Sequence, residues 1–285
     1  MRFLLTALLP LVAATSSAKR GLIFIPNSNW PQDNSIWVKP GSDLTWYYTY
    51  NNQPAPDFAH IPQSQFEFVP MMWGVGPNPD QDTAFLNSVR QLISNGTNVT
   101  HVMSYNEPDA PAEWGGSNVS PANAARAWKA NFAPLKKQGI KVGLPAVTGA
   151  PSGLLWLKQF VGNCTLLLGS PCSYDFLPVH WYDNFGGLQS HVNEAIATFP
   201  GTKIWVTEFA YANQNLAATQ SFYNQSIAWL DSLGVLERYS YFGAFRSKVS
   251  NVGPNATFLN NAGKLTDIGS WYLGGGSTGV DPQSG

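Results

Sequence analysis

The sequence carries little charge and no excess of one sign. Among its 285 residues, 16 are Lys or Arg and 17 are Asp or Glu, so charged residues make up only 12% and the formal net charge is -1. Nucleic acids and anionic membranes attract proteins through clustered positive charge, which this composition does not supply. We therefore expect neither nucleic acid nor a membrane as a partner.

Motifs of phosphate-binding and zinc-dependent enzymes are also missing. The sequence has no glycine-rich phosphate loop of the Gly-x4-Gly-Lys-Ser/Thr pattern and no His-Glu-x-x-His. These absences argue against phosphoryl transfer and against a metal-dependent hydrolase, so we expect no metal and no cofactor.

Cysteine is scarce as well, since Cys164 and Cys172 are the only two. Without nearby His ligands they fall short of a four-coordinate metal site. In an oxidising compartment two cysteines eight positions apart in one loop are expected to form a disulfide.

The N-terminus has the order of a secretory signal. Met1-Arg2 is followed by an apolar stretch over residues 3–14 and by the small residues Ser16-Ser17-Ala18. Lys19-Arg20 then resembles a dibasic processing site, so we expect residues 1–20 to be removed and the protein to be secreted, or held at the cell wall. Removal of three positive charges would change the net charge from -1 to -1 - 3 = -4.

Asn-x-Ser/Thr sequons also suit a secreted glycoprotein with sugars on its loops. Six are present, at Asn95, Asn98, Asn118, Asn163, Asn224 and Asn255.

Apolar runs that alternate with turn or helix signals predict parallel strands joined by crossover helices. Most of the runs are continuous, which indicates burial on both faces. The sequence therefore predicts an α/β protein, a (β/α)8 TIM barrel in which some outer helices are short or missing. The eight expected strands are 22–26, 44–50, 66–73, 101–105, 141–147, 174–181, 203–207 and 238–245.

The expected helices are unequal. Ser120-Pro121 starts one that ends at Gly139, with Pro134 expected to kink or break its last turn. Residues 82–93 and 217–233 also favour helices. Residues 27–43 and 51–65 are rich in Pro and Asn and predict loops. We expect one catalytic domain over residues 21–273, and a flexible Gly-rich tail over residues 274–285.

Two glutamates occupy equivalent places in this pattern. Glu107 ends an apolar strand and is followed at once by Pro108, which disfavours continuation of the strand. Glu208 ends the strand at 203–207. Side chains at such strand ends converge on one mouth of a barrel, and glycoside hydrolysis requires two carboxylates there. Either Glu alone could instead cap a helix or bind a loop amide.

The ordered motifs resemble the fungal glycosyl-hydrolase catalytic core of glycoside hydrolase family 128, which includes endo-β-1,3-glucanases and alkali-sensitive-linkage-like proteins. The resemblance runs from about Gly21 to about Leu273. It implies an endo-acting, or alternatively exo-acting, retaining β-1,3-glucanase with Glu107 as acid/base and Glu208 as nucleophile. The motifs are Tyr105-Asn106-Glu107-Pro108-Asp109, His180-Trp181-Tyr182, Trp205-Val206-Thr207-Glu208-Phe209 and Lys264-Leu265-Thr266-Asp267-Ile268-Gly269 before Tyr272.

Other residues near these motifs are candidates for substrate binding. The Asn106 amide could hydrogen-bond a sugar hydroxyl or cap a turn. Strand alternation places His180 and Tyr182 on one face and Trp181 on the other, and a tyrosine there could donate to Glu208 and hold it ionised. A buried His is often structural, so His180 could either contact the substrate or serve the fold alone.

Aromatic residues at family positions are expected to form stacking walls for sugar rings. These are Trp73, Trp46 and Tyr48, with core packing as the alternative for Trp46. Where the family pattern has Trp at the ends of strands two and eight, this sequence has Tyr50 and Tyr241. Both still offer a ring, and Tyr241 is expected to bind substrate, but linkage, chain length and endo or exo mode do not follow from the resemblance.

The expected partner is a β-glucan polysaccharide or oligosaccharide, bound by a monomer. A non-hydrolytic β-glucan-binding protein of the cell wall, on the same barrel, remains the alternative, because fold and aromatic cleft would survive loss of activity. A structural cell-wall protein is a third.

Overall fold

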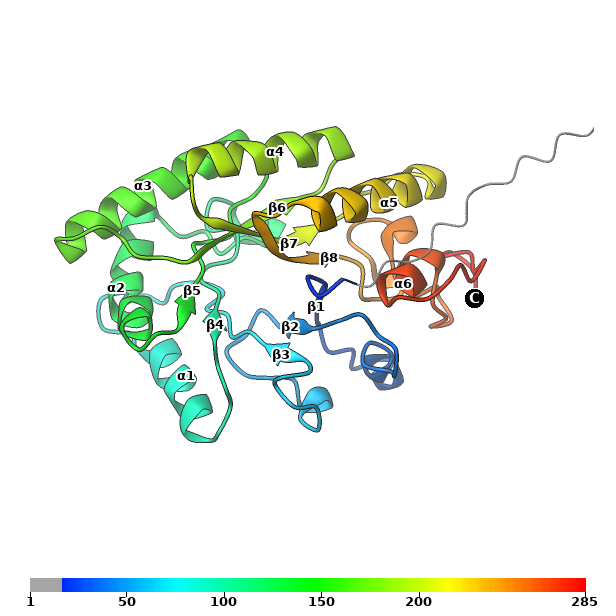
Figure 1. Cartoon of the computed structure of the whole chain (residues 1–285), viewed down its shortest axis with the longest axis horizontal. Helices are drawn as coiled ribbons and strands as arrows, with labels where there is room; N and C mark the ends of the chain where they lie inside the picture. The colour runs from blue at the N-terminus through cyan, green and yellow to red at the C-terminus, as the bar shows by residue number, and fades with distance from the viewer. Residues whose placement is uncertain (1–16) are drawn as a thin grey trace, which may run out of the picture.

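The computed structural model describes residues 17–285 and shows eight parallel strands interleaved with helices (Figure 1). Most of the expected signal segment therefore lies outside the described residues. Hydrogen-bonded pairs form three sheets in the orders β1-β2-β3, β4-β5 and β6-β7-β8, and every pair is parallel. The strands are β1 Gly21–Ile23, β2 Trp46–Tyr48, β3 Glu67–Phe68, β4 His101–Val102, β5 Lys141–Val142, β6 Phe176–Trp181, β7 Lys203–Phe209 and β8 Leu236–Tyr241.

Single parallel bridges connect the three sheets. Arg20 bridges to Tyr239, Met71 to Met103, and Gly143 to Phe176. The expected α/β class with parallel strands is confirmed, but most strands are shorter than expected and the ladder is not continuous. In the third strand, for example, Pro70 has no N–H to donate, and regular pairing ends at Phe68.

Over residues 17–285, six α-helices cover the strands. α2 begins where expected, because the Ser120 hydroxyl accepts from the Asn123 N–H, but it continues through Pro134, so the expected break is absent. α3 and α4 were not predicted. The loops after β1 and β2 hold only the 3-10 turns η1 Pro31–Ser35 and η2 Pro56–Phe58, as expected. The helices are α1 Ala84–Ser94, α2 Pro121–Lys137, α3 Pro151–Leu168, α4 Phe185–Thr198, α5 Leu216–Ser232 and α6 Asp267–Tyr272.

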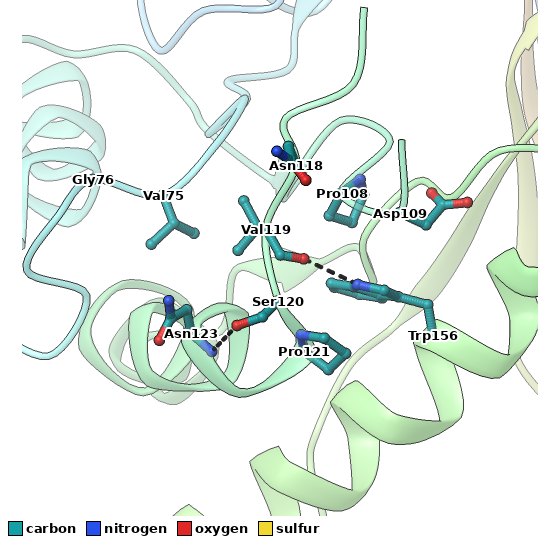
Figure 2. A pocket seen from close by; sticks show the side chains of 10 residues that line it. All are labelled: Val75, Gly76, Pro108, Asp109, Asn118, Val119, Ser120, Pro121, Asn123 and Trp156. Atoms are coloured by element: carbon teal, nitrogen blue, oxygen red, sulfur yellow. Dashed lines mark hydrogen bonds between the residues drawn. The ribbon is translucent and has the colours of Figure 1, made fainter. Parts of the chain in front are cut away.

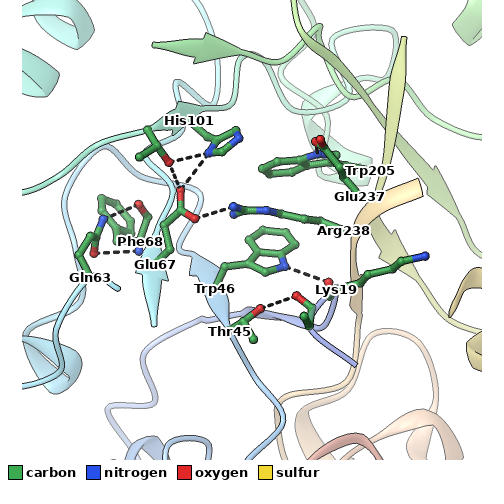
Figure 3. Close-up of polar contacts among 12 residues, drawn as sticks. Lys19, Thr45, Trp46, Gln63, Glu67, Phe68, His101, Trp205, Glu237 and Arg238 are labelled. Carbon is green, nitrogen blue, oxygen red and sulfur yellow. Dashed lines mark hydrogen bonds and ion pairs between the residues drawn. The ribbon is translucent and has the colours of Figure 1, made fainter. Parts of the chain in front are cut away.

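An aromatic and ionic cluster fills the space between the N-terminal ends of the strands (Figure 3). Glu67 accepts from Arg238 Nη2 at 2.5 Å and lies 3.0 Å from His101 Nδ1. The Arg238 guanidinium lies 4.4 Å from the centre of the Trp205 ring, and Trp46 packs beside that ring at 5.2 Å. The ion pairs of Glu67 and the packed indole rings together fill the interior at this end of the strands.

Lys19 and Arg20 are integral to the fold. The Lys19 ammonium donates to the carbonyls of Leu230, Asp231 and Leu233 at the end of α5. Arg20 is only 2% exposed and pairs with Asp43 at 3.0 Å. The expected removal of this dibasic pair would therefore cost buried contacts.

The disulfide between Cys164 and Cys172 is confirmed, with a Cα separation of 5.5 Å. Its setting differs from the single loop expected, because Cys164 lies within α3. The bond joins the last turns of that helix to the segment before β6.

The Gly-rich segment 274–285 follows the domain surface. Its backbone N–H groups at Thr278 and Gly279 donate to Asp267, and Asn261 donates to the carbonyls of Gln283 and Ser284. Composition predicted a flexible tail and did not foresee these contacts. Within residues 17–285, no helix combines the length and apolarity needed to cross a membrane.

Candidate active site

Glu107 occupies a sharp turn at the end of the fourth strand segment. Its N–H donates to the Ala146 carbonyl at 2.7 Å, and its φ of +38° is in a region that side chains other than glycine rarely adopt. Non-glycine residues in this region are concentrated at functional sites, where surrounding contacts enforce the conformation. The Glu107 side chain is 13% exposed.

Glu208 lies inside β7 and is more deeply buried, with 6% of its side chain exposed. The β6-β7 register shifts between Val179 and His180, so that His180 pairs with Glu208. Such irregularities redirect side chains near active sites. Tyr50 Oη donates to Glu208 Oε1 at 2.6 Å and Tyr182 Oη donates to Oε2 at 2.5 Å.

His180 connects the two carboxylates. Its Nδ1 lies 2.9 Å from Glu107 Oε1 and 3.5 Å from Glu208 Oε2, while Nε2 lies 3.1 Å from Thr207 Oγ1. One ligand atom from each of Glu107, His180 and Glu208 lies within 4.8 Å of the others. Among the residues described, no other group of this kind could hold a metal ion. The imidazole nitrogens already face Glu107 and Thr207, an arrangement suited to proton exchange.

The charges of this trio are coupled. Burial opposes a charge on His180, but the Glu208 and Glu107 carboxylates outweigh it and raise the pKa of His180. Burial raises the pKa of Glu208; His180 acts in the opposite direction, Glu107 adds to the rise, and the hydrogen bonds from Tyr182 and Tyr50 oppose it. The protonation of His180 and that of Glu208 therefore depend on each other.

The structure brings some expected site residues to this trio. Tyr182 binds Glu208, as predicted. Tyr48, expected as a stacking wall, is 1% exposed, and its hydroxyl donates to the Thr207 carbonyl at 3.0 Å, so its ring belongs to the core and does not face a ligand. The Asn106 amide donates to the Gly115 carbonyl at 3.2 Å, which is the turn-capping alternative, while its Oδ1 is buried without a hydrogen-bond partner among the residues described.

Other expected substrate-binding residues are not at the site. Trp46 is 1% exposed, in the cluster at the opposite end of the strands, so its core-packing alternative holds. Tyr241 is fully buried, stacked on Phe258 at 5.6 Å, because strand alternation points it toward the helix layer. Neither side chain can contact a substrate there.

Trp181 and Trp73 have different surroundings. Trp181 is half-buried and stacks on His191 of α4 at 5.5 Å, so it packs outward as alternation predicted. Trp73 is 39% exposed, and its carbonyl accepts from the Asn106 N–H at 2.9 Å. Of these two, Trp73 has the more exposed ring.

Sequence reasoning missed the role of Tyr50. The sequence indicates only a ring in place of Trp at this position, whereas the Tyr50 hydroxyl donates to Glu208. The signal was weak, since contact depends on a φ of +57° that turns Tyr50 at the end of the second strand.

A hollow of about 530 Å³ lies beside the residues that directly follow Glu107 (Figure 2). Pro108 and Asp109 line it, and Trp156 of α3 closes it by donating to the Val119 carbonyl at 3.0 Å. Asp109 accepts from both the N–H and the hydroxyl of Thr148. These bonds anchor the loop that carries Glu107.

Comparison with known proteins identifies the family to which this chain belongs. Residues 21–272 match the family described as Glycosyl hydrolase catalytic core. The chain is 29% identical over 266 residues to Alkali-sensitive linkage protein 1 of Schizosaccharomyces pombe, covering 90% of this chain and 44% of that protein. It thus spans less than half the length of that relative.

Solved structures of family 128 are similar over most of the chain. A curdlan-specific exo-β-1,3-glucanase of subgroup III from Blastomyces gilchristii, in complex with glucose, has a TM-score of 0.69 and 28% identity, covering 90% of this chain and 98% of that one. An oligosaccharide-binding protein of subgroup VII from Cryptococcus neoformans has a TM-score of 0.67 and 24% identity, covering 91% and 95%. The chain belongs to the glycosyl hydrolase catalytic core family, within glycoside hydrolase family 128.

Proposed function

We propose that this protein is a retaining glycoside hydrolase that cleaves β-1,3-glucan by double displacement, with Glu107 as acid/base and Glu208 as nucleophile. The observation that carries the proposal is the short distance between the two carboxylates. One oxygen of Glu107, one oxygen of Glu208 and one nitrogen of His180 all lie within 4.8 Å of one another. Retaining enzymes hold their carboxyl groups at about 5 to 5.5 Å, and inverting enzymes at about 6.5 to 9.5 Å.

In the first step Glu107 protonates the glycosidic oxygen while a Glu208 oxygen attacks the anomeric carbon. The leaving sugar departs as an alcohol, and a glycosyl ester forms on Glu208. In the second step Glu107, now ionised, takes a proton from water as that water attacks the same carbon. Glu208 is released as a carboxylate, and two inversions give net retention.

Tyr50 and Tyr182 fix both Glu208 oxygens, and therefore the direction of attack. The 2.9 Å contact with His180 positions the Glu107 carboxyl group, which is already reprotonated by the water that it deprotonates in the second step. Asn106 Oδ1 is available to accept from the sugar 2-OH, a contact that strengthens in the transition state.

The architecture we propose for this chemistry is a (β/α)8 barrel, since the three sheets follow one another in strand order and single bridges join β8 to β1, β3 to β4 and β5 to β6. Both glutamates then lie at the C-terminal mouth, where such barrels do their chemistry. We further propose one catalytic domain over residues 21–273, a secreted monomer, and endo cleavage.

Purified protein incubated with laminarin tests the proposal. NMR of the first products should show β-anomers before mutarotation, and long oligosaccharides should appear before glucose if cleavage is endo. Glu107→Gln and Glu208→Gln should each lose activity while still unfolding in a single cooperative transition. Initial α-anomers would make the enzyme an inverter.

A second candidate function is non-hydrolytic binding of a β-1,3-glucan oligosaccharide, favoured by the similarity to the oligosaccharide-binding protein from Cryptococcus neoformans. Calorimetric binding of laminari-oligosaccharides by a wild-type protein that releases no products would support it over the enzyme.

A further inference from the structure

The hollow in Figure 2 contains one of the six sequons. Asn118, Val119 and Ser120, which together form the sequon Asn-Val-Ser, all line it. Pockets that hold small molecules measure about 300 to 1,000 Å³, and this hollow measures about 530 Å³. A motif for N-glycosylation and a space of the size that binds small molecules therefore lie at the same place.

The Asn118 side chain is available for modification. It is exposed, and its amide makes no hydrogen bond to the other residues that line the hollow (Figure 2). Asn255 differs, because its Nδ2 donates to the Gln214 carbonyl at 2.9 Å and Thr257 of its sequon is fully buried. A glycan on Asn118 therefore displaces no hydrogen bond within the hollow, whereas a glycan on Asn255 would disrupt the fold around it.

Backbone hydrogen bonds fix the position of this sequon. The chain returns to the strand end after the turn η3 Ala112–Trp114. There the Asn118 N–H donates to the Ala110 carbonyl at 3.1 Å. The Val119 N–H donates to the Pro108 carbonyl at 2.9 Å. Asn118 has a φ of +49°, which asparagine adopts more readily than most residues. The sequon is thus bound to the segment that directly follows the first glutamate of the catalytic pair.

The walls of the hollow suit a sugar ring. Val75, Pro108 and Pro121 supply apolar surface, and Trp156 is fixed there by the hydrogen bond of its indole N–H. Asn123 adds a neutral amide. Sugar rings combine apolar faces with hydroxyl groups, and sites that bind them combine apolar walls with a few placed polar groups. An N-linked N-acetylglucosamine carries both kinds of surface and no charge, so it matches this lining.

We propose that the secreted protein carries an N-linked glycan on Asn118, and that the first N-acetylglucosamine of this glycan packs in the hollow. In the attachment step Asn118 Nδ2 attacks the anomeric carbon of a lipid-linked oligosaccharide. The bond between that carbon and an oxygen of the lipid diphosphate breaks, a carbon–nitrogen bond forms, and Nδ2 loses one proton. The packed sugar then stabilises the segment that follows Glu107. The inference rests on the proposed secretion and not on the proposed catalysis.

Protein secreted by a yeast culture tests the modification first. A glycoamidase acting in heavy-oxygen water converts each glycosylated Asn into a labelled Asp, which peptide mass spectrometry locates. The peptide that contains Asn118 should be labelled. If other sequons are labelled and Asn118 is not, this proposal is overturned while secretion stands. If no sequon is labelled and the protein remains in the cell, the proposed secretion fails and this proposal fails with it.

The rate of deglycosylation tests the packing. From the folded protein the glycoamidase should release the Asn118 glycan at least about 10-fold more slowly than from the corresponding tryptic glycopeptide, a factor that corresponds to about 1.4 kcal/mol of protection. Asn98 is the matched site, because it begins the similar sequon Asn-Val-Thr and is exposed before β4. A glycan on Asn98 should show no such difference. Equal slowing at both sites would mean that the fold as a whole, and not the hollow, hinders the glycoamidase.

Thermal unfolding tests the stabilisation. In protein from yeast, Asn118→Asp should lower the unfolding midpoint by about 2 to 4 °C, as for the loss of a modest stabilising contact in a domain of about this size. Asn98→Asp makes the same change of charge at an exposed sequon and should leave the midpoint unchanged. In protein from a bacterial periplasm, which adds no such glycan, the wild type and Asn118→Asp should unfold at the same midpoint.

The two hosts separate the glycan from the charge. If Asn118→Asp lowers the midpoint equally in both hosts, the new carboxylate and not the lost glycan is responsible, and the packing of the sugar is overturned. The packing is overturned as well if the glycan is present on Asn118 but leaves the folded protein and the glycopeptide at the same rate. None of these measurements depends on hydrolytic activity, so failure of the proposed catalysis would leave their results unchanged.

Discussion

Tyr182 Oη lies 2.5 Å from Glu208 Oε2, and this hydrogen bond opposes the effect of burial on the carboxyl group. An ionised carboxylate accepts hydrogen bonds at both oxygens, and such charge-assisted bonds are short and strong. Tyr50 supplies the second bond at 2.6 Å. Burial raises the pKa of Glu208, whereas the two phenols stabilise the ionised form that attack on a sugar requires.

Replacement of Tyr182 by Phe should therefore raise the pKa of Glu208 further. A hydrogen bond to a charged group contributes about 1.5 to 3 kcal/mol, so kcat should fall about 10- to 100-fold. The acidic limb of the pH profile of kcat/KM should move to higher pH, because Glu208 would stay protonated longer. Tyr174→Phe is the control, since Tyr174 packs on Phe199 away from the site. An unshifted acidic limb would contradict this role.

The raised pKa of His180 predicts that the stability of the protein depends on pH. Its pKa is raised in the folded protein by the two carboxylates despite burial. A group of this kind contributes stability that is fully present below its unfolded pKa of about 6.5 and is lost as the pH rises through the folded pKa. Part of the free energy of unfolding should therefore decline above about pH 6.5.

Urea unfolding of the wild type and of His180→Asn, at a series of pH values, measures this contribution. The variant should lack that decline, whereas His60→Asn, at an exposed position, should keep it. The same decline in wild type and His180→Asn would mean that His180 is neutral in the folded protein at all these pH values.

The lowered pKa of Glu67 predicts that the protein loses stability in acid. Burial opposes its charge, but the hydrogen bond with His101 and the charge of Arg238 lower the pKa of Glu67 from 4.5 to about 2. A lowered pKa contributes stability above the unfolded value, which is lost as the pH falls toward the folded value. Between about pH 4.5 and pH 2 the wild type should lose about 3 kcal/mol through this group.

Comparison of two Glu→Gln variants tests the assignment. Glu67→Gln should be less stable than the wild type at pH 7, and this difference should shrink toward pH 2. Glu113→Gln, at an exposed position on η3, should match the wild type throughout. A difference for Glu67→Gln that is constant with pH would mean that packing, and not charge, is lost.

The sequence allowed prediction of features that depend on local pattern. Alternation along the sixth strand placed Tyr182 beside Glu208 and turned Trp181 outward, because side chains in a strand alternate between faces. Ser120 marked the start of α2 through a cap that depends on residues three positions apart. The two glutamates were found because each ends an apolar run.

Features that depend on distant contacts were not predictable in this way. Tyr241 follows its strand pattern, yet only the packing of Phe258 against it shows that this ring is in the core. Tyr50 reaches Glu208 across 158 positions of sequence. The contact between the loops that follow β1 and β8 depends on the pair formed by Asp33 and Arg246, which are 213 positions apart.

The start of the mature chain is also open to test. Lys19 and Arg20 contact α5 and Asp43, so we expect them to be retained, with signal cleavage before them. N-terminal sequencing of protein from a culture medium should read Lys-Arg before Gly21. Arg20→Ala, which leaves Asp43 unpaired, should lower the free energy of unfolding by about 3 kcal/mol. A chain starting at Gly21 with wild-type stability would restore the dibasic processing hypothesis.

The roles of Glu107 and Glu208 can be separated with azide. In Glu107→Ala an activated aryl glucoside still glycosylates Glu208, because its leaving group needs no proton, but water then lacks a base. Azide needs no base, and should release the intermediate as a β-glycosyl azide after two inversions. In Glu208→Gly azide can occupy the vacated space and attack once, which gives the α-glycosyl azide.

Rates and anomeric configurations together decide the assignment. Loss of the acid/base should lower the rate on natural glucan by about 100- to 10,000-fold, because proton transfer contributes that much to catalysis. NMR of the azide products identifies the number of inversions in each variant. If the configurations are exchanged between the two variants, Glu208 is the acid/base and Glu107 the nucleophile. If both variants keep wild-type activity, the pair is not catalytic, and the close placement of these carboxylates around His180 serves the fold alone.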